Sequence, residues 1–311
     1  MKKILWLLAA AAIAPAADPP PPDLEISNGT LRAKLFTPDP DKGYYRGTRF
    51  DWAGQIASLE RKGHNYFGVW YPIERYNPKL HDAILGPVDS FNAIGYDEAP
   101  VGGKFLRIGV GWLKRPDAPQ VDNFRTYDIV DGGKWSTKKG KDWVEFTHTL
   151  AGTYVYTKRV RLDKDKLVID HTLKNTGQKA LETDTFNHDF FMLDNQPTSP
   201  DIVVKFPFEA KGGSDWRGAG DLKGNELVYR QELTGNQQVS GAITGYGDTA
   251  KDHDFKVENR KTGVGVHQIG NKPISRLYFW SIRTTVCPEA YVHIRVEPGK
   301  QDRWQSAYEF Y

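Results

Sequence analysis

The sequence predicts an all-β fold, a large antiparallel β-sandwich. Short segments of alternating apolar and polar residues recur between Gly, Pro, Asn and Asp along the chain, which is typical of antiparallel strands and turns. The 30 glycines and 19 prolines are spread along the 311 residues, and 13% of the residues are aromatic, which suits tight turns and strands with a wide interior. No stretch has sustained helical spacing of apolar residues, so we expect few and short helices.

The first residues follow the order of a secretory signal peptide. A positively charged start at 1–3 precedes an apolar run at 4–13 and small residues at 14–17. The apolar run is shorter than the roughly 20 residues that span a bilayer. Residues 1–17 are therefore predicted to be a signal peptide. The mature protein is predicted to be periplasmic or secreted, without membrane association after signal removal.

The rest of the chain is predicted to form one domain. Residues 18–23 contain four consecutive prolines, which favours an extended tether. Residues 24–311 are enough for a large core, and no change in composition marks a boundary. Within them, Tyr154–Leu162 and Leu167–Leu173 are predicted to form a hairpin. Further strands are predicted at Ile202–Phe206 and Leu277–Trp280, which are rich in β-branched or aromatic residues.

Charge and cysteine content exclude several classes of function. The net charge is only +3, and basic residues are interleaved with acidic ones, so nucleic acid is not an expected partner. The single cysteine, Cys287, permits no internal disulfide. No Cys or His spacing resembles a zinc site, so no metal is predicted.

Three short motifs follow one another in the second half of the chain. The first is an Asn-Thr-Gly turn at 175–177, followed about ten residues later by Asn-His at 187–188 and an aromatic pair. The second is Asp-His-Asp-Phe at 252–255. The third is Cys-Pro-Glu at 287–289, followed by Pro-Gly-Lys at 298–300 and a final Tyr-x-Phe strand. A lone histidine in a strand is more often a hydrogen-bonded core residue, but its place in this motif favours a functional role.

In this order, the motifs resemble those of galactose mutarotases, the aldose 1-epimerase-like proteins. The resemblance spans nearly the whole mature chain and implies the large antiparallel sandwich of that family. It implies that His188 is the general acid, Glu289 the general base, and Asp252 a ligand of sugar hydroxyls. Asn187, which precedes the histidine in the motif, is a further predicted substrate-binding residue.

The reaction that the resemblance implies is the interconversion of the two anomers of an aldose. A carboxylate removes the proton of the anomeric hydroxyl, and an imidazolium delivers a proton to the ring oxygen, which opens the ring. We expect the acid and the base on opposite sides of the sugar ring. No cofactor is needed, and the predicted partner is a monosaccharide or oligosaccharide.

The first third of the chain departs from the family pattern. Mutarotases carry Gly-Arg-x-Ala-Asn-Arg and Leu-His-Gly-Gly segments there, whereas residues 73–82 read Ile-Glu-Arg-Tyr-Asn-Pro-Lys-Leu-His-Asp. Arg75 and His81 are predicted to take the places of the missing arginine and histidine. Arg49 lies beside aromatic residues, and its planar guanidinium suits a sugar hydroxyl or carboxylate. Without a tight motif around these three residues, a structural role remains the alternative for each.

Two other functions remain open at this stage. The first is a polysaccharide lyase or a glycoside-cleaving enzyme, because one scaffold can support several carbohydrate reactions. An arginine such as Arg49 or Arg75 near the pocket, placed to neutralise a uronate carboxylate, would favour it. The second is a non-catalytic carbohydrate-binding protein, for which the missing segments of the first third are the support.

Overall fold

The computed structural model describes residues 20–311, so the predicted signal peptide lies outside the described residues. Part of the predicted tether is ordered. Asp23 already belongs to the first strand, and the backbone N–H of Thr37 donates to the carbonyl of Pro22 at 2.9 Å. No helix among the described residues has the length and apolar character needed to cross a membrane.

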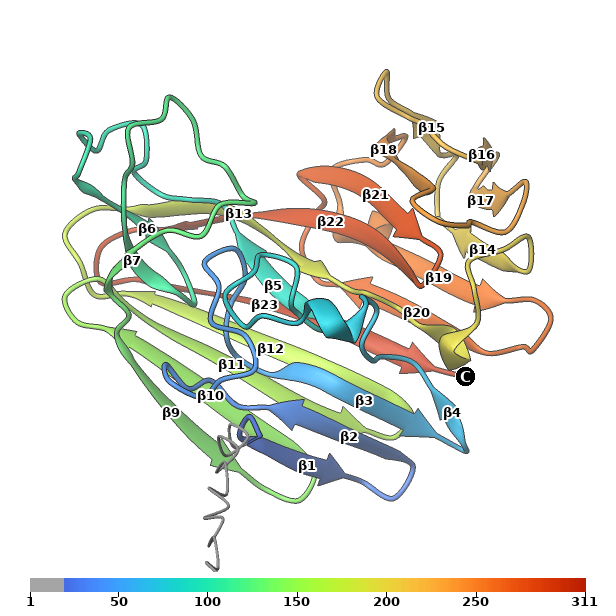
Figure 1. Ribbon diagram of the computed structural model, residues 1–311, viewed down its shortest axis with the longest axis horizontal. Helices are drawn as coiled ribbons and strands as arrows, with labels where there is room; N and C mark the ends of the chain where they lie inside the picture. Colours follow the sequence, from blue (N-terminus) through green and yellow to red (C-terminus); the bar gives the residue numbers. More distant parts are fainter. Residues whose placement is uncertain (1–19) are drawn as a thin grey trace, which may run out of the picture.

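The largest element is a ten-stranded antiparallel sheet that runs across the molecule (Figure 1). Its strands, in spatial order, are β16 (Gly220–Lys223), β17 (Glu226–Tyr229), β14 (Ile202–Lys205), β19 (Asp254–Asn259), β20 (Gly265–Gly270), β23 (Gln301–Phe310), β12 (Lys166–Asn175), β11 (Tyr154–Asp163), β10 (Trp143–Leu150) and β9 (Lys134–Lys139).

A six-stranded antiparallel sheet lies over one half of the large sheet (Figure 1). Its strands, in spatial order, are β15 (Lys211–Gly212), β18 (Gln238–Thr244), β21 (Arg276–Ile282), β22 (Thr285–Val296), β13 (Leu181–His188) and β5 (Val88–Phe91). Apolar side chains of the two sheets share one core. Val204 and Phe255 of the large sheet belong to the same buried cluster as Val239 and Phe279 of the smaller one.

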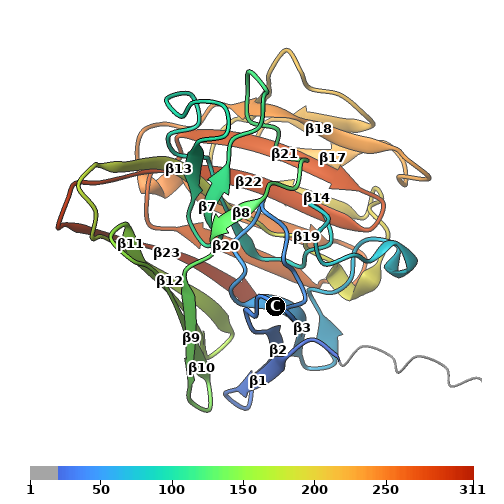
Figure 2. The same ribbon diagram turned by 60° about the vertical axis from the view of Figure 1, so that its left-hand side comes forward.

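Two small sheets and three single-turn helices complete the described structure. The strands are β1 (Asp23–Ser27), β2 (Leu31–Phe36), β3 (Gln55–Arg61) and β4 (His64–Asn65) in one sheet, and β6 (Lys104–Arg107), β7 (Gly111–Lys114) and β8 (Ile129–Asp131) in the other. The helices are 3₁₀ turns: η1 (Ile73–Arg75), η2 (Leu193–Asn195) and η3 (Ala250–Asp252). Figure 2 shows β1–β3 beside the end of the large sheet that β9–β12 form, and their buried side chains extend the main core.

The predicted all-β sandwich is confirmed. The predicted hairpin is β11 and β12, which pair from Tyr154 opposite Asn175 to Asp163 opposite Lys166. Alternate residues of β11 are buried, as the period of two along a strand requires. The two further predicted strands are present as β14 and β21.

Candidate active site

The pairing of β13 with β22 brings two of the sequence motifs together. The two strands are antiparallel, with Thr185 opposite Val292, and the same register continued along both strands places His188 opposite Glu289. The side chains meet, with His188 Nε2 3.3 Å from Glu289 Oε1. Both residues are buried, at 4% and 5% exposure. Two predicted site residues that are distant in the sequence are therefore in direct contact.

The neighbouring strand β21 extends this face of the sheet. Tyr278 lies opposite Glu289 and Arg276 lies opposite Tyr291 in the pairing of β21 with β22. Because side chains directly opposite one another project from the same face, these four residues share the face that carries His188. The sheet thus presents acidic, basic and aromatic groups to one side.

Loops close over this face and form a pocket of about 480 Å³, a volume in the usual range of small-molecule sites. Both strand residues and loop residues line the pocket, and several of the loop residues come from the first third of the chain. The lining consists of Arg49, Phe50, Trp70, His81, Asp82, Phe124, His188, Phe190, Arg217, Gln238, Arg276, Tyr278, Trp280, Glu289 and Tyr291.

Aromatic rings surround the imidazole of His188. Phe190 stacks on it with ring centroids 3.8 Å apart and an interplanar angle of 4°. Trp70 in turn stacks on Phe190, with ring centroids 4.6 Å apart. Trp280 and Phe50 present edges at 5.6 and 5.7 Å. These rings fix the orientation of the imidazole and exclude water from it.

Burial sets the protonation states of His188 and Glu289. Loss of hydration, together with the positive charge of Arg49, holds the pKa of His188 well below its usual range. Burial raises the pKa of Glu289 to about 7, while Arg49 and Arg276 oppose that rise. Within residues 20–311, His188 Nδ1 has no hydrogen-bond partner. Near neutral pH, the environment therefore favours a neutral imidazole instead of the predicted imidazolium.

The geometry also corrects the expected placement of the acid and base. Groups whose polar atoms are 3.3 Å apart cannot hold a sugar ring between them. His188 and Glu289 lie side by side on adjacent strands and face the pocket from the same wall. A substrate must approach both of them from the pocket.

Two of the three candidate residues from the first third of the chain lie at the pocket. Arg49 and His81 both line it. The guanidinium of Arg49 lies over the ring of Phe50, 4.6 Å from its centroid, and 5.2 Å from that of Phe124. Arg75 does not line the pocket, because the single-turn helix η1 leaves it exposed to solvent.

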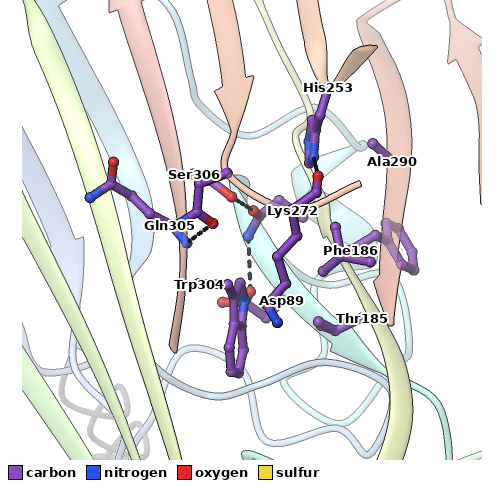
Figure 3. A pocket seen from close by; sticks show the side chains of 12 residues that line it. Asp89, Thr185, Phe186, His253, Lys272, Ala290, Trp304, Gln305 and Ser306 are labelled. Carbon is purple, nitrogen blue, oxygen red and sulfur yellow. Dashed lines mark hydrogen bonds between the residues drawn. The ribbon is translucent and has the colours of Figure 1, made fainter. Parts of the chain in front are cut away.

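Asn187 points to the opposite face of the sheet from its neighbour His188, as alternation along a strand requires. Its Nδ2 donates to Asp89 Oδ1 at 3.0 Å, and Ser306 Oγ donates to its Oδ1 at 2.6 Å. These groups line a cavity of only about 10 Å³, and Figure 3 shows Asp89 and Ser306 at this cavity. The structure places Asn187 outside the pocket, where its amide ties β13 to β5 and β23.

The structure also places Asp252 outside the pocket. It ends the single-turn helix η3, and its Oδ2 accepts the backbone N–H of Gly247 at 2.6 Å. The next residue, His253, is buried, and burial lowers the pKa of its imidazole to about 4. The Asp-His segment thus stabilises a local turn, which is a frequent role of aspartate.

A cluster of buried charges lies under the site, and the sequence analysis did not identify it. Lys158 Nζ is 2.7 Å from Asp89 and 3.5 Å from Asp51, and His171 Nε2 is 3.0 Å from Asp89 Oδ1. All four residues are at most 1% exposed. The alternation of buried residues in β11 could have revealed the cluster, because Lys158 occupies an inward position between Tyr156 and Val160.

Several pocket residues were not predicted from the sequence, namely Asp82, Phe124, Arg217, Gln238, Arg276, Tyr278 and Tyr291. Alternation in the strand at 276–282 would have placed Arg276, Tyr278 and Trp280 on one face. It would not have shown which residues that face contacts. Among residues 20–311, no group of three His, Cys, Asp or Glu side chains is arranged to hold a metal ion.

Comparison with known proteins finds similarity in structure and not in sequence. No family model matches the sequence, and no curated protein is similar to it in sequence. The structure is similar to Slr1438 from Synechocystis sp. PCC 6803, with a TM-score of 0.58 and 12% identity over 97% of this chain and 99% of that one. It is also similar to a proposed aldose 1-epimerase from Escherichia coli K12, with a TM-score of 0.55 and 14% identity over 93% and 98% of the two chains.

A galactose mutarotase-like protein from Lactobacillus casei ATCC 334 has a TM-score of 0.53 and 15% identity over 93% of this chain and 100% of its own. These similarities cover almost the whole of each chain, at sequence identities that carry information on the fold alone. The chain therefore has the galactose mutarotase-like, or aldose 1-epimerase-like, β-sandwich fold.

Proposed function

We propose that the protein is an exported isomerase of the aldose 1-epimerase type, which acts on the anomeric carbon of a sugar. The observation that carries this proposal is the contact between His188 and Glu289, 3.3 Å apart in the wall of a pocket of about 480 Å³. The aldose 1-epimerase-like fold and the order of the sequence motifs support it. The apolar start of the sequence supports export.

The spacing of the two groups suits a hemiacetal. The anomeric hydroxyl oxygen and the ring oxygen are bonded to the same carbon, so they lie closer together than atoms in van der Waals contact. Two catalytic groups that act on these oxygens must also be neighbours. Side-by-side placement of His188 and Glu289 meets this requirement, because each can reach one oxygen from the same wall.

The buried pair needs only one transferable proton. Burial favours the uncharged form of each group, a protonated Glu289 and a neutral His188. The carboxyl group can then give its proton to one sugar oxygen while the imidazole takes the proton from the other. Ring opening leaves Glu289 as a carboxylate and His188 as an imidazolium, and these two groups reverse both proton transfers when the ring closes on either face of the aldehyde.

Aromatic side chains supply a surface for the sugar. Trp70, Trp280 and Tyr278 all line the pocket. Such rings present an apolar face to the C–H groups of a sugar, while the indole and phenol carry polar edges. The Trp70 indole already donates to the carbonyl of Ile84 at 2.8 Å, which fixes its ring beside the stack on His188.

Proton NMR of freshly dissolved α-glucose and α-galactose tests this proposal. We expect the purified protein to accelerate equilibration of the anomers, and His188→Ala and Glu289→Gln to abolish the acceleration. His293→Ala is a matched control, because His293 lies on the same strand as Glu289 but is exposed. Full activity in both pocket variants would refute the assigned roles.

A lyase acting on acidic polysaccharides is a second candidate, and the position of Arg49 in the pocket favours it. A guanidinium beside the base could neutralise the carboxylate of a uronate and so acidify the adjacent C–H. Incubation with a panel of acidic polysaccharides distinguishes the two candidates. Unsaturated products that depend on Glu289 would support the lyase, and anomer exchange without such products would support the isomerase.

A further inference from the structure

The pocket around His188 and Glu289 is rich in arginine. Arg49, Arg217 and Arg276 line it, against the two carboxylates of Asp82 and Glu289. A neutral hexose offers only hydroxyl groups and needs no excess of cationic side chains. Three guanidinium groups in one pocket instead create a positive potential that attracts an anion.

The three guanidinium groups have no carboxylate partner within the described part of the chain. Arg276 lies over the ring of Tyr291 at 3.7 Å, and Arg49 over that of Phe50 at 4.6 Å. Arg217 Nε donates to Ser240 Oγ at 3.0 Å. Aromatic stacking holds a guanidinium by its flat face and leaves the N–H donors at its edge free, and these donors bind planar or tetrahedral anions.

Two of these arginines lie close to the acid and base. Arg276 is on β21, opposite Tyr291 and two residues from Tyr278, which lies opposite Glu289. Arg49 reaches the pocket from a loop. Both arginines act electrostatically on Glu289 and on Tyr291, so they flank the same part of the pocket. An anionic group between Arg49 and Arg276 would lie directly beside the site of proton transfer.

The position between Arg49 and Arg276 corresponds to the C6 group of an aldose. The ring oxygen joins the anomeric carbon to the carbon that carries the exocyclic C6 group. When His188 and Glu289 engage the anomeric hydroxyl and the ring oxygen, the C6 group is a nearby exocyclic substituent. In a uronic acid this group is a carboxylate, and in a hexose 6-phosphate it is a phosphate ester.

We propose that the substrate is an acidic sugar whose anionic C6 group binds Arg276 and Arg49, with Arg217 adding to the positive field. This inference rests on the proposed function for the position of the anomeric centre. It narrows the substrate class from sugars in general to anionic aldoses, free or at the end of a chain. The expected anion is a carboxylate, because the carboxyl carbon of a uronate is bonded directly to the ring and its charge therefore lies close to the anomeric centre.

The test compares neutral and anionic sugars with the full protein. Anomer exchange is measured by NMR for glucose, galactose, glucuronate, galacturonate and glucose 6-phosphate, at low and high salt. We expect a kcat/KM at least about ten-fold higher for the uronates than for the neutral sugars, as one charge-assisted contact would give, and a decline with salt for the anions alone. A larger preference for the phosphate would assign the anion to a phosphate ester instead.

Two variants complete the design. Arg276→Gln is expected to lower kcat/KM for the uronates by about ten-fold more than for glucose, whereas Arg303→Gln, an exposed arginine of β23 outside the pocket, leaves both unchanged. Equal rates for neutral and anionic sugars, or an equal loss for both in Arg276→Gln, would overturn the inference while the isomerase proposal stands.

If no sugar is equilibrated, the isomerase proposal fails and ligand-detected NMR decides the inference by binding alone. Binding of glucuronate or galacturonate that is lost in Arg276→Gln would then support an acidic-sugar site. Equal or absent binding of neutral and anionic sugars would overturn it. The two proposals therefore fail by different observations.

Discussion

Replacement of Glu289 by Gln tests the electrostatics of the site without any knowledge of the substrate. Burial raises the pKa of this carboxyl from its ordinary value of 4.5 to about 7. A raised pKa in the folded state means that the protonated form stabilises the fold below pH 4.5, and that this stability is lost as the pH rises toward 7. At about 1.36 kcal/mol per pKa unit, the loss amounts to about 3 kcal/mol.

His188 acts in the opposite direction in the wild-type protein. Its pKa is lowered in the folded state, so stability increases as the pH rises toward 6.5, the ordinary pKa of histidine. Between pH 4.5 and 6.5 the two contributions offset each other, and the wild-type stability curve alone conceals both. The difference between wild type and Glu289→Gln isolates the carboxyl, because glutamine does not titrate.

The assay is urea denaturation of both proteins at pH values from 4.5 to 8.5. We expect the free energy of unfolding of Glu289→Gln, relative to wild type, to increase by about 3 kcal/mol across this range and to level off above pH 7. Glu74→Gln serves as control, since Glu74 is exposed on η1, and its difference should remain within about 0.5 kcal/mol at every pH. A flat or falling difference for Glu289→Gln would refute the assigned environment.

Three further variants probe the rest of the site. His188→Ala should lower kcat for anomer exchange by about 10²- to 10⁴-fold with an unchanged far-UV circular dichroism spectrum; a retained kcat would contradict its role. Lys158→Met removes the ammonium group that contacts both Asp51 and Asp89, so it should destabilise the fold by about 3–5 kcal/mol in urea titrations, whereas a loss within experimental error would exclude this cluster as a structural element. Asn187→Ala should lower the free energy of unfolding by about 1–3 kcal/mol without raising KM, because its amide faces away from the pocket. A raised KM with unchanged stability would instead place Asn187 at the substrate.

Local sequence patterns were sufficient to predict some of the strands. The period of two in the segments that become β11 and β12 predicts both strands of the hairpin, because alternate side chains of a half-buried strand must face the core. The same period identifies which side of β21 carries Arg276, but not which residues lie opposite it. The residues opposite Arg276 are set by the pairing of β21 with β22, which is a tertiary contact that the local sequence pattern does not reveal.

The motifs differed in how well they located pocket residues. His188 and Glu289 were predicted from their motifs alone, and the pairing of β13 with β22 brings both to the pocket. Asp252 lies in a short turn outside the pocket, where an aspartate is common for local reasons. Asn187 was assigned to the substrate by its place beside the histidine, but adjacent residues of a strand point to opposite faces.

The pocket is built partly from strands and partly from loops, and the arginine and histidine segments of mutarotases are missing from the loops. His188 and Glu289 project from paired strands, whereas Arg49 and His81 come from loops, and the departures from the mutarotase pattern fall in the loop segment at 73–82. A sheet holds two groups in fixed register, which proton transfer requires, whereas loops can change without disturbing that register. Strand positions carry the two residues proposed as acid and base, while the loop positions lack the arginine and histidine motifs of the family, so we expect this protein to differ from galactose mutarotases mainly in the substrate it binds. On this view Arg276, a strand residue with free donors beside Glu289, is the residue whose replacement should change substrate preference most.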